Sequence, residues 1–183
     1  RRADVVCVSH DHHDHLGDAI QICKMTNATF VGVFELGVYA ESQGVRDVVA
    51  MNIGATLDVR GMEVSMVPAF HSSSRGPPVG FVFGKPDFKI YHAGDTGLFT
   101  DMRLIGELYR PKLACLPIGG YYTMGPREAA KAVELLQPQK VIPMHYGTFP
   151  VLEQSAERFV IELEKLGLAE RAVILKPGES VEL

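Results

Sequence analysis

The ten residues SHDHHDHLGD, at positions 9–18, constrain this chain more than any other part of its sequence. Four of the seven histidines lie here within six consecutive positions, with two aspartates among them. The apolar run 3–8 (ADVVCV) before the stretch predicts a buried strand, and residues 16–20 after it predict the start of a helix. Imidazole and carboxylate groups suit zinc, and also iron, manganese or nickel. The stretch therefore predicts metal ligands on a strand-to-helix turn; the alternative is a polar loop that binds no metal, or binds it loosely.

Strands and helices interleave along the rest of the chain. The apolar patterns predict strands at 29–34, 48–51, 55–60, 62–70, 79–84, 88–92, 113–118, 140–144 and 172–175. They predict helices at 16–26, 35–43, 101–109, 126–137 and 153–166. Hairpins, such as the one with Arg60-Gly61 at its turn, accompany this alternation, so one mixed sheet covered on one face does not account for the pattern. We expect one domain over residues 1–183 that combines α+β and α/β features in an αββα sandwich.

The bulk properties exclude several classes of partner. A formal net charge of −4 argues against broad, sequence-independent binding of nucleic acid. The three cysteines have no metal-binding spacing, which is typical of free thiols in a reducing compartment, so we expect a cytoplasmic protein. No apolar run approaches the length of a membrane span. We expect a small-molecule substrate and neither a membrane nor a nucleic-acid partner, with formation of a homo-oligomer left open.

The spacing within the histidine-rich stretch has a geometric meaning. Alternate residues of an extended strand end point the same way, so His10 and His12 can face one metal. Asp14 and His15, at the turn into the helix, can face a second metal beside the first. Two metals need more ligands, and three further candidates follow expected strands: His71, Asp95 and His145.

These motifs resemble the metallo-β-lactamase superfamily of metal-dependent hydrolases, and the match extends over most of the chain. The motifs that carry it are H-x-H-x-D-H at 10–15, the lone His71, Gly-Asp-Thr at 94–96 and the final His145. A narrower resemblance is to the poorly characterised metal-dependent hydrolase branch, which is related to the ascorbate-6-phosphate lactonases. It rests on PIGG at 117–120, TMGP at 123–126 and PMHYGT at 143–148.

The resemblance implies a site for two divalent cations, with Zn²⁺ expected and manganese, iron or nickel as alternatives. It implies that the ligands of the first cation are His10, His12 and His71. It implies that the second is held by Asp14, His15 and His145, and that the carboxylate of Asp95 bridges both. A water bound between two such cations loses its proton near neutral pH and becomes the nucleophile. Asp14 and Asp95 are therefore the expected catalytic residues, with Asp14 also able to take or give a proton.

The expected activity is hydrolysis of a small ester-like bond: a lactone, a phosphodiester or a phosphorylated sugar lactone. One alternative is a non-catalytic metal-binding domain that acts as a sensor or as part of an assembly. A third is a metal-dependent nuclease, which the acidic charge disfavours. Hydrolysis of β-lactams is disfavoured, because the common zinc β-lactamases carry a cysteine near the position of Asp95.

Other polar residues near the motifs have separate expectations. His13 is the spacer of the motif and is expected to point away from the metals. Residues 72–75 (SSSR) are expected to form a solvated loop, with substrate contact as the alternative. The expected substrate contacts are Tyr122, Thr123 and Tyr146.

The position of the histidine-rich stretch near the start of the chain differs from the family pattern. The domain normally has two or three strands before this motif, with an Ile-Asp-Pro turn whose aspartate supports the metal site. We therefore expect an N-terminally incomplete domain, with an exposed sheet edge that is prone to association.

Overall fold

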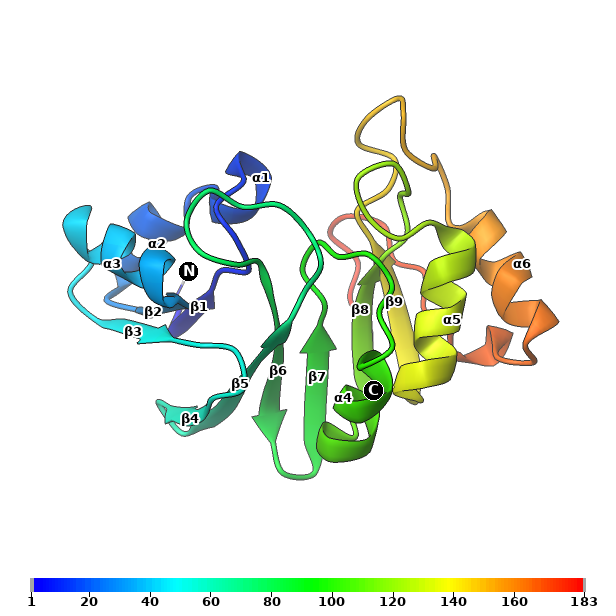
Figure 1. Ribbon diagram of the computed structural model, residues 1–183, viewed down its shortest axis with the longest axis horizontal. Coiled ribbons are helices and arrows are strands. Elements are labelled where there is room, and N and C mark those ends of the chain that lie inside the picture. Colours follow the sequence, from blue (N-terminus) through cyan, green and yellow to red (C-terminus); the bar gives the residue numbers. More distant parts are fainter. Residues whose placement is uncertain (1, 183) are drawn as a thin grey trace. The chain divides into compact units, whose positions relative to one another are not determined.

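The computed structural model describes residues 2–182, and their contacts divide into two compact units (Figure 1). The first unit comprises the chain up to residue 88 together with residues 93–95, and the second comprises residues 89–92 and the chain from residue 96 onward. Among residues 2–182, no helix has both the length and the apolar character needed to cross a membrane. The prediction of one domain over the whole chain stays a prediction.

The first unit begins with a parallel sheet whose strands follow one another in sequence order. The strands are β1 (Val5–Cys7), β2 (Thr29–Val33) and β3 (Val48–Met51). Parallel neighbours require crossover connections, and here these contain α1 (His13–Leu16), α2 (Ala19–Thr26) and α3 (Phe34–Ser42). Every residue of β2 is buried, as expected for a central parallel strand covered on both faces. Because β1 ends at Cys7, the histidine-rich stretch begins where this strand ends.

An antiparallel sheet completes the first unit. Its strands are β4 (Thr56–Val59), β5 (Met62–Pro68) and β6 (Val79–Lys85). The predicted hairpin turn is confirmed: Arg60 and Gly61 both have positive φ, 54° and 80°, as the two-residue turns that match strand twist require. The two sheets share one apolar core, in which Phe30 and Leu36 on one side are grouped with Met66 and Phe81 on the other.

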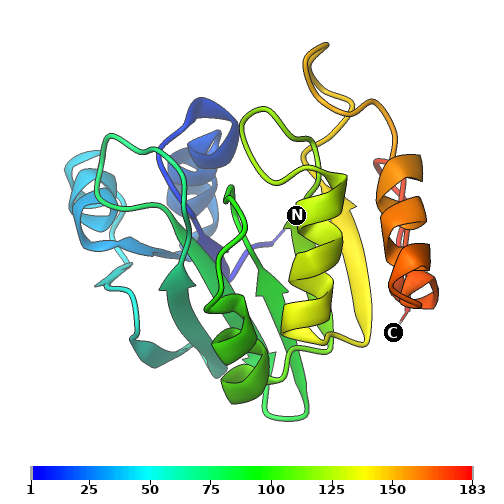
Figure 2. The same ribbon diagram turned by 45° about the vertical axis from the view of Figure 1, so that its right-hand side comes forward.

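The second unit is a parallel sheet covered by helices. Its strands pair in the order β7 (Phe88–His92), β8 (Leu113–Pro117) and β9 (Lys140–Met144). Its helices are α4 (Met102–Tyr109), α5 (Pro126–Leu136), α6 (Glu157–Lys165) and the short 3₁₀ helix η1 (Ala169–Arg171). Figure 2 shows α6 beside α5, and α5 also contacts α4 and β8. The three α-helices have buried residues, among them Ile105 on α4, Val133 on α5 and Phe159 on α6.

The predicted strand 172–175 is wrong. It is reduced to one isolated bridge, in which Ala172 pairs with Val141 and the amide of Val173 donates to the carbonyl of Val141 over 2.9 Å. The next position on this side of β9 is Pro143, which has no N–H to donate, so the ladder cannot continue. An apolar pattern in the segment itself carries no information about the partner strand.

Two predicted helices differ from the observed helices in where they begin or end. The helix expected over 16–26 is two helices, because Gly17 adopts φ +40° and ends α1 before α2 begins. The helix expected from residue 153 begins only at Glu157. The backbone of Glu153 is engaged elsewhere: its amide donates to the carbonyl of Gly119 over 2.9 Å, and its carbonyl accepts from Gly147 over 2.8 Å.

Candidate metal centre

Three of the predicted ligands come together in the first unit. Nε2 of His10 lies 2.9 Å from Nδ1 of His12. The ring of His71 lies with its centroid 5.1 Å from each of the other two ring centroids. One nitrogen from each of the three residues lies within 4.8 Å of the other two. The alternation of His10 and His12 along the chain thus puts their donor atoms side by side, and a loop some sixty residues later adds the third.

The carboxylate of Asp95 lies against the same histidines. It is 3% exposed, with Oδ1 3.2 Å from Nε2 of His15 and Oδ2 3.6 Å from Nε2 of His71. Gly94 makes this approach feasible, because it adopts φ +61° and a Cβ there would lie 2.7 Å from the carbonyl of Val79. Each carboxylate oxygen therefore faces a different histidine, as expected for a carboxylate shared by two cations.

The donor set fits divalent metal ions. Two ligand atoms of a tetrahedral zinc site, each about 2.0–2.1 Å from the ion, lie roughly 3.4 Å apart, close to the separations of 2.9, 3.2 and 3.6 Å found here. Burial away from water, and then the nearby His15, lower the pKa of His10 to about 3. Its imidazole is therefore neutral at neutral pH, which is the form that binds a metal.

Ser9 is a residue of this centre that the sequence patterns did not single out. Its hydroxyl oxygen lies 3.0 Å from Nδ1 of His10 and 3.2 Å from Nδ1 of His15. A hydroxyl oxygen can accept hydrogen bonds from both Nδ1–H groups, which leaves the Nε2 lone pair of each ring for a cation. Its position next to the motif was the only available signal, since a serine there is equally compatible with a plain turn.

We expect Ser9→Ala to weaken metal binding about 10- to 100-fold, because both imidazoles lose the group that holds their orientation. Competition with a chromophoric chelator measures this affinity. Ser42→Ala is the matched control, since Ser42 lies at the exposed end of α3, where its hydroxyl donates to the carbonyl of Tyr39 and accepts from Nε2 of Gln43. An unchanged affinity in Ser9→Ala would show that the hydroxyl does not orient the two rings.

The remaining residues of the motif lie on α1. The carboxylate of Asp14 is 37% exposed, and its Oδ2 is 3.7 Å from Nε2 of His15. The side chain of His13 is 90% exposed, in line with its expected role as a spacer. Asp14 thus lies beside His15, a half-buried ligand candidate, while it also contacts solvent.

His145 and the expected substrate contacts Tyr122, Thr123 and Tyr146 belong to the second unit. His145 directly follows β9 and adopts φ +56°, a strained conformation for a residue with a side chain, of the kind that is enriched at functional sites. The loops after β8 and β9 are tightly joined, because a Cβ on Gly119 would collide with the carbonyl of His145. The ring of Tyr122 contacts those of Tyr121 and Phe149, with centroid separations of 4.8 and 6.5 Å.

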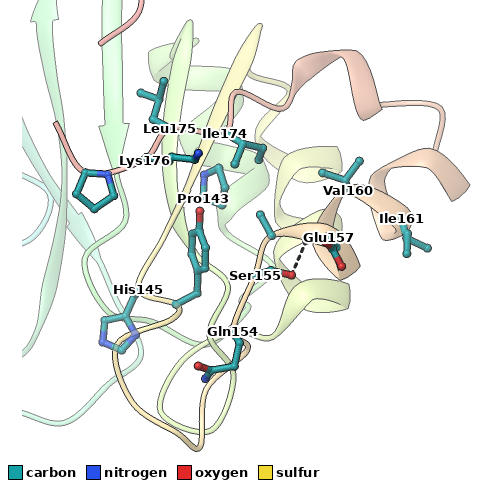
Figure 3. Close-up of a pocket in the computed structure, with 13 residues that line it drawn as sticks. Pro143, His145, Gln154, Ser155, Glu157, Val160, Ile161, Ile174, Leu175 and Lys176 are labelled. Carbon is teal, nitrogen blue, oxygen red and sulfur yellow. Dashed lines mark hydrogen bonds between the residues drawn. The ribbon is translucent and has the colours of Figure 1, made fainter. Parts of the chain in front are cut away.

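A groove of about 950 Å³ in the second unit lies next to His145 (Figure 3). Its walls are largely apolar and include Pro143, Val160, Ile174 and Leu175, and Tyr146 also lines it. In Figure 3 the imidazole of His145 lies at the end of the groove away from Ile174 and Leu175. Of the three expected substrate contacts, Tyr146 is the one found in this groove.

Comparisons with known proteins agree with these features. A family model described as a beta-lactamase superfamily domain matches residues 1–146. A UPF0173 metal-dependent hydrolase of Methanopyrus kandleri is 57% identical over 188 residues, which cover 98% of this chain and 82% of the relative. Another, from Caldivirga maquilingensis, is 54% identical over 184 residues, covering 100% of this chain and 81% of the relative.

Among solved structures, Igni18, a metallo hydrolase from the archaeon Ignicoccus hospitalis, matches with a TM-score of 0.92 at 41% identity. The match covers 98% of this chain and 79% of that one. The chain therefore belongs to the metallo-β-lactamase superfamily, among its UPF0173 metal-dependent hydrolases. The predicted superfamily and the predicted fold class are confirmed, whereas the relation to the ascorbate-6-phosphate lactonases stays a prediction.

Proposed function

We propose that this protein uses two divalent cations to hydrolyse a small ester-like bond, in a lactone, a phosphodiester or a phosphorylated sugar lactone. The observation that carries the proposal is the convergence of the imidazoles of His10, His15 and His71 on the buried carboxylate of Asp95, with His12 beside His10 and His71. The names of its relatives, which are metal-dependent hydrolases, support the same reaction type. Zn²⁺ is the expected metal, with manganese, iron or nickel as alternatives.

In this proposal the protein's own residues hold and orient the reacting groups. His10, His12 and His71 would hold the first cation, and Asp95 would offer one oxygen on the side of His15 and the other on the side of His71. For the second cation the proposal keeps the ligands implied by the family resemblance: Asp14, His15 and His145. When bound, the cations supply a water made acidic enough to act as a nucleophile and polarise the bond to be cleaved.

Asp14 is the residue proposed to move a proton. Its carboxylate is partly exposed and lies beside His15, so a substrate proton can reach it without passing through the buried ligand cluster. In the second unit, the groove next to His145 is large enough for a small molecule, and we propose that Tyr146 contacts the substrate there. Tyr122 and Thr123 remain proposed contacts on the loop after β8.

Elemental analysis and activity assays on the same preparation test the proposal. We expect about two divalent cations per chain, and turnover on a panel of lactones and phosphodiesters that stops when a chelator removes the metal. Bound metal without turnover on any member of the panel would favour the sensor or assembly alternative. Cleavage of oligonucleotides in preference to small esters would favour the nuclease. Cytoplasmic location and self-association stay predictions.

A further inference from the structure

Asp11 lies between two proposed metal ligands, but its carboxylate binds the loop that follows His71. The side chain of Asp11 is 3% exposed. Its Oδ1 accepts hydrogen bonds from the hydroxyl of Ser73 over 3.0 Å and from the amide of Ser74 over 2.9 Å. Its Oδ2 accepts one from Nη1 of Arg75 over 2.9 Å. Two side chains and one backbone amide of a single loop therefore converge on one buried carboxylate, and the guanidinium makes its hydrogen bond charge-assisted.

The other side of the same loop is held by helix α3 and the strand before it. The guanidinium of Arg75 lies over the ring of Tyr39, 4.2 Å from its centroid, in cation–π contact. The next residue, Gly76, adopts φ +77°, and a Cβ on it would collide with the carboxylate of Glu35 and the side chain of Val33. Residues 72–75 form a loop in which Ser74 and Arg75 are exposed, as expected, but Ser73, Ser74 and Arg75 are also anchored by their contacts with Asp11 and α3.

His71 lies only two residues before Ser73, so the contacts between this loop and Asp11 act close to the imidazole. The last residue of β5 is Pro68, and the chain from there to β6 has no sheet pairing to fix its course. The contacts to Asp11 are thus the nearest polar anchors after His71 that tie this loop to the motif carrying His10 and His12. A displacement of this loop would move His71 away from both rings.

We infer that Asp11 is a positioning residue that holds His71 in the ligand set of the first cation. The inference rests on the proposed metal site. In this inference the motif supplies two ligands directly, His10 and His12. Asp11, which lies between them, holds the distant loop that carries the third ligand. Metal affinity at the first site then depends on a carboxylate that does not itself bind the metal.

A double-mutant cycle between Asp11 and His71 tests this dependence. Cobalt(II) is the probe, because its visible d–d bands report ligand number and geometry, and titration gives its affinity. Asp11→Ala is expected to weaken cobalt binding about 10- to 100-fold and to shift the bands toward those of His71→Ala. Asp11→Asn keeps an oxygen that can accept from Ser74, so it is expected to restore part of the loss.

The decisive comparison is the variant with both substitutions. If Asp11 acts through His71, adding Asp11→Ala to His71→Ala weakens binding no further than His71→Ala alone, within about twofold. Additive losses, or cobalt bands in Asp11→Ala identical to those of the wild type, would overturn the inference. Asp4→Ala is the matched control, because Asp4 forms an exposed ion pair with Arg2 at 2.8 Å and is expected to leave cobalt binding unchanged.

Two further readouts separate the failure modes. If the wild type and His71→Ala bind cobalt equally, the result contradicts the proposed metal site itself, which is a different outcome from a failure of the role assigned to Asp11. If Asp11→Ala does not fold, Arg75→Gln takes its place in the cycle, since it removes the charged contact to Oδ2 and leaves the Ser73 and Ser74 contacts intact. Arg75→Gln is then expected to weaken binding less than His71→Ala and non-additively with it, and additivity would again contradict the inference.

Discussion

Asp95→Ala is expected to abolish hydrolysis and to lower the bound metal content to one cation per chain or fewer. The buried carboxylate of Asp95 has one oxygen 3.2 Å from His15 and the other 3.6 Å from His71, so its removal takes an oxygen donor away from both of these ligand candidates. We expect turnover to fall at least about a thousandfold, which corresponds to roughly 4 kcal/mol in the activation free energy. Elemental analysis and initial rates on the best substrate of the panel measure the two effects.

Asp101→Ala is the control for this substitution, because Asp101 is an exposed aspartate before α4. It is expected to keep both metal content and rate. Retained turnover in Asp95→Ala, within about tenfold of the wild type, would contradict the proposed mechanism. A variant that loses turnover but keeps both metals would instead place Asp95 among the groups that act on the substrate.

Phe30→Ala is expected to have the largest effect on stability. Phe30, the second residue of β2, is fully buried, and it belongs to the core that the two sheets of the first unit share. Truncation of a buried phenylalanine leaves a cavity and typically costs about 3–5 kcal/mol in the free energy of unfolding. Urea unfolding followed by circular dichroism measures this change.

Met25→Ala is the matched control in the same unit, since Met25 on α2 is 74% exposed. Its effect is expected to be within about 0.5 kcal/mol. A loss below about 1 kcal/mol in Phe30→Ala would mean that the neighbours collapse into the cavity, and that the two sheets do not depend on this ring for their packing.

Much of the fold follows from short-range patterns. The strands 48–51, 88–92 and 140–144 were predicted with the bounds that the structure has. The hairpin at Arg60-Gly61 and the helix opened by Pro126 also agree, because a turn type or a helix start depends on a few adjacent residues. The predicted strand at 172–175 failed because its pairing depends on a proline in another segment.

For the candidate metal centre, too, one part could be predicted from the sequence and another part could not. The identity of its ligand candidates could be inferred from sequence, because histidines and aspartates stand at recognisable strand ends and match an ordered family motif. The structure brings His10, His12, His71, His15 and Asp95 together in the first unit. The metal ligation itself stays a prediction, as does the inclusion of His145.

The donor types and their order along the chain can be read without a structure, since they depend on residue identity and on the two-residue period of a strand. The orientation of those donors cannot be read from the sequence. Ser9 contacts two imidazoles at once, and Asp11 reaches a loop more than sixty residues away. The contact of Asp11 has no local pattern, because it arises only when folding brings distant segments together, and Ser9 meets both imidazoles only once the turn that carries them has formed. The tertiary structure therefore decides how the ligand candidates are held.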